Sequence, residues 1–297
     1  MNIFISNNNV PGANTINLGN HLYPILVGLT FYEKIIEQHK FEDINIYFCN
    51  ECEEKYNFKQ KISIYIISKF PLLKKRINFV SYNNFSQLLS SSNYIEYTKL
   101  NIDDISIEKD IYIYGYCQSA KYIDFDRIRY YFLNSPVYDY INVLYGDNIN
   151  EYVSIHIRRG DYLKDGNLEI YFTLSKEYIV DVIDKFFKND KFVIISDDIQ
   201  WCKDNLSDIT TNDVKFIDVK NPNYMPEFYM LIDLCIPIIT KGNIVSPSSF
   251  CMFGASINPN KNIIINDPYY KKKELNEDEK LKIVPSWAKK HTILTYN

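Results

Sequence analysis

The stretch that decides the fold runs Tyr152, Val153, Ser154, Ile155, His156, Ile157, Arg158, Arg159, Gly160, Asp161. Its first part is an apolar run typical of a buried strand, and two arginines follow where that strand would end. Neighbouring arginines offer forked donors to phosphate oxygens, which the point charge of lysine matches less specifically. The stretch therefore predicts a strand with a phosphate-binding site at its carboxyl end.

Short β-branched runs alternate with longer amphipathic segments from Glu151 onward. We expect strands at 152–157, 191–196, 214–217, 236–240 and 262–266, and helices at 172–187, 199–206, 226–235 and after Ser248. Strands that alternate with helices form a parallel sheet covered on both faces. The second half of the chain is thus predicted to be a Rossmann-like domain.

The first half is less regular. We expect strands at 1–6, 44–49 and 111–114, a long helix at 22–38, and the start of a helix within 123–131. The sequence of region 51–109 does not indicate a topology. The turn-forming residues 145–148 indicate a boundary near Asp147. The prediction is two α/β domains, residues 1–147 and 148–297.

Length and charge exclude some classes of protein. The 297 residues suffice for two domains, and the 26 tyrosines and 15% aromatic content argue against disorder. The formal net charge of −4 and pI of about 5.7 lack the basic footprint of a general nucleic-acid binder. Positive charge at the two arginines therefore predicts a single anionic ligand, and nucleic acid is not expected as a partner.

The expected location is the cytoplasm. The first nine residues lack the basic and apolar parts of a secretory signal, and the apolar segments 22–29 and 231–239 are shorter than the roughly 20 residues that span a bilayer. Peripheral association with the inner face of the membrane stays open. The six cysteines are expected to be free thiols, because one C-x-x-C pair at Cys49 and Cys52 is a poor zinc signal.

A strand that ends in H-x-R-R-G-D resembles the first shared motif of the α1,2-fucosyltransferases, and more loosely that of the α1,6- and protein O-fucosyltransferases. Other stretches resemble motifs of the same family in the same order. They are 17–21 (family G-x-G-N-Q), 115–122 (G-Y-x-Q-S-x-K-Y), 195–198 with Trp201, and 246–254 (N-S-S-F-S-W-W-G).

The resemblance implies a GT-B fold, in which two Rossmann-like domains face each other across a cleft. The first domain would hold the acceptor and the second GDP-fucose. It also implies inverting, metal-independent transfer of L-fucose to the 2-hydroxyl of a galactose-terminated glycan during polysaccharide assembly, with no cofactor. Transfer of another nucleotide-activated sugar, or a catalytically silent nucleotide-sugar or glycan-binding protein, remains the alternative.

Arg158 is the residue on which this interpretation depends most. Negative charge grows on the β-phosphate as the glycosidic bond breaks, and a preorganised cation stabilises that transition state. Side chains alternate along a strand, so His156 and Arg158 share a face and Arg159 points toward a structural carboxylate or a domain interface. The alternative is that both arginines form structural ion pairs.

Two segments at helix starts are further candidates for donor binding. Asn17, Gly19 and Asn20 precede a helix expected to begin near His21, so its free N–H groups could face an anion, although without the resemblance a plain helix start with an Asn cap is the preferred interpretation. Asn17 and His21 depart from the family pattern, which puts those contacts in doubt. Ser248, Ser249 and Phe250 also precede a helix and suit either phosphate binding or N-capping.

Three carboxylates complete the donor-side predictions. Asp233 lies in an apolar run and must find a partner. By resemblance it accepts hydrogen bonds from the guanine edge near His156, and a buried salt bridge is the alternative. Asp197 and Asp198 end a strand, where they either cap a helix or contact sugar or ribose hydroxyls.

A general base must take the proton of the acceptor hydroxyl. The candidates are Asp161, Asp165 and Glu169 in the loop after the arginines, and the motif favours Asp161, although pairing with an arginine explains it as well. Asp124 and Asp126 form a D-x-D pattern, yet they lie at an expected helix start. No metal is predicted, because an arginine can neutralise the leaving group instead.

Overall fold

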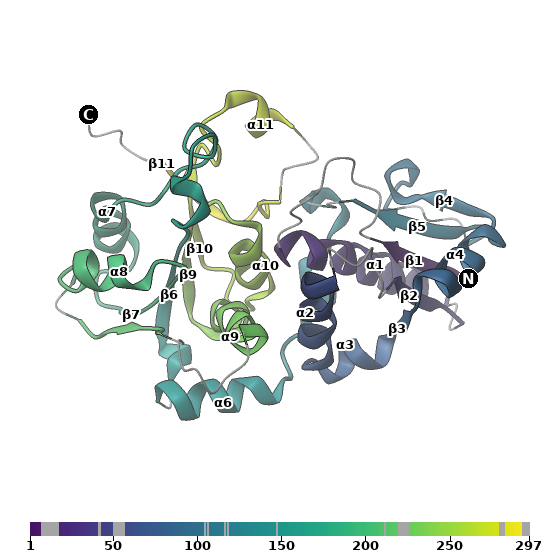
Figure 1. The fold of residues 1–297 in the computed structure, drawn as a ribbon, viewed down its shortest axis with the longest axis horizontal. Coiled ribbons are helices and arrows are strands. Elements are labelled where there is room, and N and C mark those ends of the chain that lie inside the picture. Colours follow the sequence, from purple (N-terminus) through teal and green to yellow (C-terminus); the bar gives the residue numbers. More distant parts are fainter. Residues whose placement is uncertain are drawn as a thin grey trace. The chain divides into compact units, whose positions relative to one another are not determined.

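The computed structural model describes residues 1–6, 18–40, 43–49, 57–103, 105, 107–115, 117, 119–146, 148–210, 212–218, 226–278 and 283–292 (Figure 1). It divides into two compact units, Met1–Pro136 and Val137–Asn297. The division precedes the predicted boundary at Asp147 because α6 (Pro136–Tyr145) belongs to the second unit, where the ring of Tyr140 packs edge-on against Phe228 with centroids 4.9 Å apart.

The first unit is a parallel sheet with the strand order β3-β2-β1-β5-β4. Its strands are β1 (Asn2–Ser6), β2 (Asn45–Cys49), β3 (Ile77–Val80), β4 (Tyr94–Glu96) and β5 (Asp110–Tyr114). Its helices are α1 (Leu18–His39), α2 (Asn57–Ser68), α3 (Pro71–Arg76), α4 (Tyr82–Ser90) and α5 (Phe125–Ile128), with 3-10 turns η2 (Tyr97–Lys99), η3 (Ala120–Tyr122) and η4 (Arg129–Tyr131).

The predicted strands of the first unit are confirmed to within a residue. The long helix predicted at 22–38 is also present, but it begins four residues earlier, at Leu18, so Gly19 and Asn20 lie inside it and not before it. The described part of region 51–109, for which no topology was predicted, contains β3, β4, α2, α3, α4 and η2. An aromatic cluster of Phe4, Phe85 and Tyr112 helps to hold α4 against this sheet.

The second unit is a parallel sheet with the order β11-β10-β9-β6-β7-β8. Its strands are β6 (Tyr152–Ile157), β7 (Lys191–Ser196), β8 (Val214–Phe216), β9 (Gly242–Val245), β10 (Ile263–Asp267) and β11 (Lys289–Thr292). Besides α6 its helices are α7 (Lys176–Phe186), α8 (Ile199–Leu206), α9 (Pro226–Ile239), α10 (Ser249–Ile257) and α11 (Lys273–Glu277), with turns η5 (Ile149–Glu151) and η6 (Asp161–Leu163). Taken in chain order this is the doubly wound arrangement, so the predicted Rossmann-like half is confirmed.

One predicted strand of the second unit is wrong. Residues 236–240 continue α9 to Ile239, and the next strand, β9, begins only at Gly242. The run from Leu231 to Ile239 is almost uniformly apolar, and such a run has no periodicity to separate a buried helix from a buried strand. The predicted helix at 172–187 is shorter, because the hydroxyl of Ser175 caps α7 by accepting from the N–H of Tyr178 at 3.2 Å.

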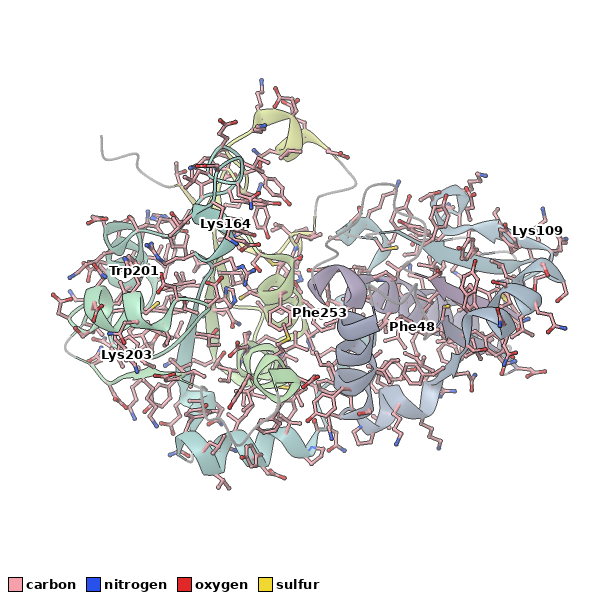
Figure 2. All side chains as sticks on the ribbon, viewed as in Figure 1. Phe48, Lys109, Lys164, Trp201, Lys203 and Phe253 are labelled. Carbon is pink, nitrogen blue, oxygen red and sulfur yellow. The ribbon has the colours of Figure 1, made fainter. Side chains whose placement is uncertain are left out.

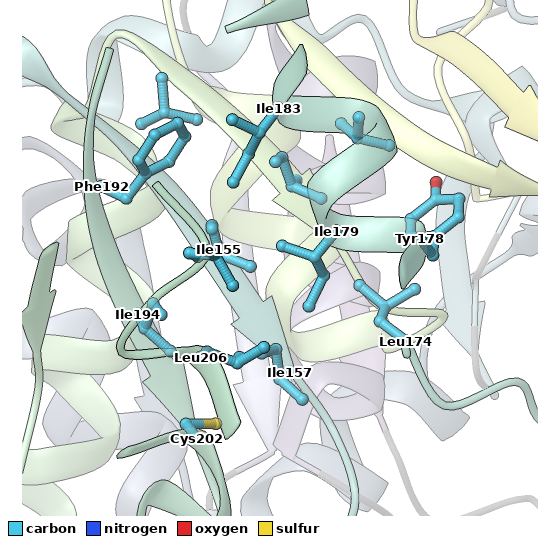
Figure 3. Close-up of a cluster of buried hydrophobic side chains, with 14 of the residues drawn as sticks. Ile155, Ile157, Leu174, Tyr178, Ile179, Ile183, Phe192, Ile194, Cys202 and Leu206 are labelled. Carbon is cyan, nitrogen blue, oxygen red and sulfur yellow. The ribbon is translucent and has the colours of Figure 1, made fainter. Parts of the chain in front are cut away.

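A hydrophobic core fixes β6 in place (Figure 3). Ile155 and Ile157 point from β6 into a cluster formed with α7, α8 and the neighbouring strand β7. Its members include Leu174, Tyr178, Ile179, Ile183, Phe192, Ile194, Cys202 and Leu206. All six residues of β6 are buried, so the chain leaves the sheet at a fixed place and Arg158 is the first residue beyond it.

The described cysteines Cys49, Cys117, Cys202, Cys235 and Cys251 are free and buried, as predicted, and Cys52 lies outside the described residues. In the described ranges, no helix combines the length and the hydropathy needed to cross a membrane.

Candidate active site

The site lies where the strand connections of the second sheet reverse direction. From β6 the chain continues toward β7 and β8, whereas from β9 it continues toward β10 and β11 on the other side. A crevice for ligands forms beyond the carboxyl ends of two such neighbouring strands. The hydroxyl of Ser246 ties them together there: it donates to the carbonyl of His156 at 2.8 Å and accepts from the N–H of Arg158 at 3.0 Å.

Arg158 is held by two carboxylates. Its Nε donates to Oδ1 of Asp161 at 2.8 Å, and its Nη1 contacts Oδ2 of Asp197 at 3.0 Å. Burial opposes the charge, but the two carboxylates outweigh it and keep the pKa of Arg158 above its ordinary value. With its side chain 32% exposed, the guanidinium is fixed in direction and still accessible to a ligand.

Arg159 has a different set of partners. Its Nε donates to Oδ2 of Asp198 at 3.3 Å, and its guanidinium stacks 3.7 Å from the ring centroid of Trp201, which is labelled on α8 in Figure 2. The structural carboxylate predicted for Arg159 is therefore Asp198. The same aspartate caps α8, because its Oδ1 accepts from the N–H of Trp201 at 3.3 Å.

Asp197 braces the loop that carries both arginines. Besides contacting Arg158, it accepts the backbone N–H of Arg159 at 2.9 Å through Oδ1. A Cβ on Gly160 would stand 2.6 Å from Oδ2 of Asp197, so only glycine allows this approach without displacing the carboxylate. Each of these carboxylate oxygens can accept a second hydrogen bond, so the predicted contact of Asp197 with a sugar or ribose hydroxyl is compatible with both.

His156 presents a neutral imidazole to the site. The residue is 6% exposed, and within the described part of the chain its Nδ1 has no hydrogen-bond partner. Burial, and then the charge of Arg158, lower the pKa of His156 to about 3. At neutral pH the ring can therefore donate and accept one hydrogen bond each, and it carries no charge.

Asp233 is a second polar group whose charge is not paired by the residues that the structure describes. It is half-buried on α9, and burial, followed by the charge of Asp197, raises the pKa of Asp233 to about 7. The described residues offer it no salt bridge, so the buried ion pair considered from the sequence does not form among them. The carboxyl group is near the midpoint of its titration at neutral pH.

The start of α10 brings further hydrogen-bond donors to this edge of the sheet. Ser248 takes the N-cap position, yet its hydroxyl makes no capping hydrogen bond, contrary to the capping alternative. Ser249 and Phe250 form the first turn, where backbone N–H groups have no partner within the helix. These groups lie directly after β9, at the same edge as Arg158.

The remaining donor-side candidates belong to the first unit. Asn17 lies outside the described residues, and Gly19 and Asn20 are in the first turn of α1, whose side chains up to His21 are not described. The predicted role of this segment stays a prediction.

Of the three candidate bases, Asp161 alone contacts Arg158 among the described residues. Its backbone carbonyl accepts from Nδ2 of Asn167 at 2.8 Å, which fixes the start of the loop. Asp165 and Glu169 are exposed on the following turns.

The D-x-D pattern has structural roles. Asp124 caps α5 by accepting from the N–H of Arg127 at 3.2 Å, and Asp126 pairs with Arg129 at 2.6 Å. No group of three or more metal-ligating side chains occurs in the described ranges.

A row of tyrosines beside Arg158 escaped the sequence analysis. Tyr162 stacks on Tyr171 with ring centroids 4.2 Å apart, its hydroxyl donates to the carbonyl of Pro247 at 2.5 Å, and its ring lies 6.0 Å from the guanidinium of Arg158. Tyr171 in turn lies 5.8 Å from Tyr270. The abundance of tyrosine was the available signal, but it did not show which rings meet.

Solved structures confirm the predicted GT-B fold. An α-1,6-fucosyltransferase NodZ soaked with GDP-fucose superposes with a TM-score of 0.52 at 14% identity, over 90% of this chain and 95% of that one. NodZ from Bradyrhizobium gives 0.51 at 13% identity, over 91% and 96%. At this identity the likeness concerns the fold alone.

The chain belongs to glycosyl transferase family 11, whose model matches residues 46–290. It is 34% identical over 132 residues to an α-1,2-colitosyltransferase of Escherichia coli, covering 42% of this chain and 43% of that protein. It is 26% identical over 212 residues to the O-antigen biosynthesis glycosyltransferase WbnK of Escherichia coli, covering 64% and 66%. Each match spans less than two thirds of the relative.

Proposed function

We propose that this protein transfers L-fucose from GDP-fucose to the 2-hydroxyl of a galactose-terminated glycan, with inversion at the anomeric carbon and without a metal, in the cytoplasm. Family membership and relatives named for α-1,2 transfer and O-antigen biosynthesis support the class of reaction. The observation that carries the proposal is Arg158, held in a fixed direction at the switch point of the second sheet.

Arg158 binds the diphosphate and stabilises the charge that develops on it. Two of its nitrogens already have carboxylate partners, so an incoming phosphate takes Nη2 and competes with Asp161 for Nε. The start of α10 supplies further donors to the phosphates from Ser248 and from the N–H groups of Ser249 and Phe250. This arrangement stabilises the departing GDP more than the bound donor, which is the condition for a faster reaction.

Asp161 is the general base in this mechanism. Displaced from Arg158 by the phosphate, its carboxylate accepts the proton of the acceptor 2-hydroxyl while that oxygen bonds to the anomeric carbon. The bond from the anomeric carbon to the phosphate oxygen breaks, and its electron pair leaves with GDP. The proton is then on Asp161 and the new glycosidic bond has the inverted configuration.

The guanine base is recognised by Asp233 and His156. An ionised Asp233 accepts hydrogen bonds from the N–H groups of guanine, and the neutral ring of His156 supplies the unpaired Nδ1 beside it. We assign further contacts with the donor to Asn17, Gly19 and Asn20, and we assign to the first unit the galactose that accepts the transferred sugar. Specificity for guanine then arises because another base would leave the buried polar groups of Asp233 and His156 without hydrogen-bond partners.

A second donor is favoured by one observation, namely the 34% identical relative named for colitose transfer. Colitose is L-fucose without its 3-hydroxyl group, so both donors present the same diphosphate to Arg158. The choice between them depends on contacts with that hydroxyl.

Purified protein should be incubated with a galactoside panel and, in turn, GDP-fucose, GDP-colitose, GDP-mannose and UDP-galactose, with GDP release and product mass as readouts. We expect turnover with GDP-fucose and a product carrying fucose on the galactose 2-hydroxyl. Turnover with GDP-colitose alone would show that colitose, not fucose, is the transferred sugar. Turnover with UDP-galactose alone would refute the assignment of a GDP-linked donor. Binding of GDP-fucose without turnover on any acceptor would indicate a silent binding protein.

A further inference from the structure

A cavity lies within the second unit, at the carboxyl end of β10. Its volume is about 300 Å³, and its walls come from β10 and the residues after it, from α11, from segment 284–286 and from β11. The side chains that the argument uses are Asn266, Asp267, Tyr269, Tyr270, Ser286 and Lys290. None of them belongs to the donor site described above.

Within the described part of the structure, the side-chain amide of Asn266, which lines this cavity, has one bonded and one unpaired polar atom. Asn266 is 1% exposed and donates from Nδ2 to the carbonyl of Pro268 at 2.7 Å. Its Oδ1 is also buried, and no residue in the described ranges donates to it. An acceptor left unpaired in this way costs on the order of 1–3 kcal/mol, so a hydroxyl that reached it would bind with a clear gain.

Aromatic rings form one wall, and the backbone behind them is rigid. The rings of Tyr269 and Tyr270 meet edge-on, 4.9 Å between centroids. Asn276 holds Tyr270 through two bonds, accepting its N–H at 2.9 Å and donating to its carbonyl at 2.7 Å. A preformed pocket with aromatic faces and a few convergent polar groups is typical of small-ligand sites.

The charges of the cavity indicate the class of ligand. Asp267 and Lys290 are the charged residues among its lining, and their formal charges cancel. An anion such as a nucleotide diphosphate finds no excess of positive charge here, unlike at Arg158. The lining combines tyrosine rings, side-chain amides, a hydroxyl and one pair of opposite charges. Such a surface suits a neutral sugar, which has apolar C–H faces and hydroxyl groups.

The tyrosine row connects this cavity to the donor site. From Tyr270 the next ring is Tyr171, at 5.8 Å and joined to it by an isolated antiparallel bridge, and Tyr162 follows at 4.2 Å. Tyr162 lies beside Arg158. Tyr162 and Tyr270 are 7% and 8% exposed and pack on their neighbours, so the row is a buried link between the wall of the cavity and the loop that carries Arg158.

We propose that the cavity at the end of β10 binds a neutral sugar unit of the acceptor glycan, remote from the galactose that receives the transferred sugar. The inference rests on the proposed function for the nature of its ligand. It predicts that the protein prefers oligosaccharides over single galactosides, and that the preference arises in the second unit.

The test compares two exposed neighbours on β11. Lys290 lines the cavity, whereas the ammonium of Lys289 lies 5.9 Å from the ring of Phe186. We expect Lys290→Ala to raise the KM for a galactose-terminated tetrasaccharide several-fold, and the exposed rim substitution Ser286→Trp to raise it tenfold or more. Lys289→Ala, and every variant assayed with methyl β-galactoside, should match the wild type, as should the KM for GDP-fucose.

Saturation-transfer NMR with the tetrasaccharide, without any donor, separates this inference from the proposed function. If the wild type binds the tetrasaccharide and Ser286→Trp does not, the result supports sugar binding in the cavity, even if no transfer is found with any donor. Normal transfer with equal KM values for Ser286→Trp, Lys290→Ala and wild type would overturn the cavity and leave the proposed function intact. Displacement of the tetrasaccharide by GDP would also overturn it.

Discussion

Arg127 in the first unit and Arg158 in the second are held in similar ways. Arg127 contacts Glu37 at 2.6 Å and Asp124 at 3.3 Å with 28% of its side chain exposed, and Arg158 has two carboxylates at 2.8 and 3.0 Å with 32% exposed. Yet Arg127 lies on a short helix, whereas Arg158 follows a buried strand where the sheet reverses direction. Ion pairing alone therefore says little about function, and position relative to the sheet says more.

The strongest test of this comparison removes each arginine in turn. Arg158→Ala should lower kcat by a factor on the order of 10² or more, because it deletes the cation at the departing phosphate. Arg127→Ala, with the same change in charge and similar exposure, should leave kcat within about twofold, since surface ion pairs contribute on the order of 1 kcal/mol or less. Steady-state kinetics with GDP-fucose, after circular dichroism has verified folding, provide the measurement.

Arg158→Lys sharpens the same test. Lysine keeps the charge but loses the forked geometry, so we expect most of the loss to persist. Equal kcat values for Arg158→Ala and Arg127→Ala would show that the strand-end position has no special role.

Gly160→Ala should have the next largest effect. The new methyl group would displace the Asp197 carboxylate from Arg158 and from the Arg159 backbone, so we expect kcat to fall roughly tenfold, about 1.4 kcal/mol of transition-state stabilisation. Combining it with Asp197→Ala gives a double-mutant cycle. If the clash is the cause, Gly160→Ala should cost much less in the Asp197→Ala background, and additive losses would contradict it.

The pH dependence of donor binding should follow Asp233. Its pKa of about 7 means that the ionised form, which accepts from guanine, grows as the pH rises through neutrality. The KM for GDP-fucose should therefore fall several-fold between pH 6 and pH 8 in the wild type, and Asp233→Asn should show a higher KM without this pH dependence. A pH profile that is unchanged in Asp233→Asn would assign the titration to another group.

Stability should respond to the same carboxyl group in the opposite sense. The folded-state pKa is raised above the unfolded value near 4, so the unfolded state binds fewer protons between these values and stability from this group is lost as the pH rises through about 7. Asp233→Asn should thus raise Tm at pH 8 more than at pH 5, as thermal unfolding can measure.

Chelation should have the smallest effect. If a guanidinium neutralises the leaving group, dialysis against EDTA should change kcat by less than about twofold, because no step then depends on a divalent ion. Loss of activity that Mn²⁺ or Mg²⁺ restores would show that Arg158 does not act alone, and would weaken the contrast with Arg127.

The fold was predictable where an apolar run of typical strand length is bounded by polar residues. Alternating β-branched runs gave β6 and β7 at their observed bounds, because each is short and ends at polar residues. The end of α9 was missed, because its apolar run continues through Ile239 without a polar residue to mark the face. The region 51–109 was missed since its strands have only three or four residues, too few to show a period.

The site was predictable only as far as adjacent residues determine it. Strand alternation separated Arg158 from Arg159, and this separation is observed in their different partners. The brace from Asp197 across the loop depends on the pairing of β6 with β7, which brings together residues 38 apart in the chain. The tyrosine row is equally a product of tertiary folding, and no local pattern marks it.

The hydroxyl of Ser246 joins the two sides of the site across 88 and 90 residues of sequence. During synthesis on the ribosome, Arg158 therefore emerges long before the serine that fixes its backbone. A nascent chain that ends before β9 would have the paired arginines but no assembled nucleotide site. Competence to bind the donor should thus arise late in translation, once nearly the entire second unit has left the exit tunnel.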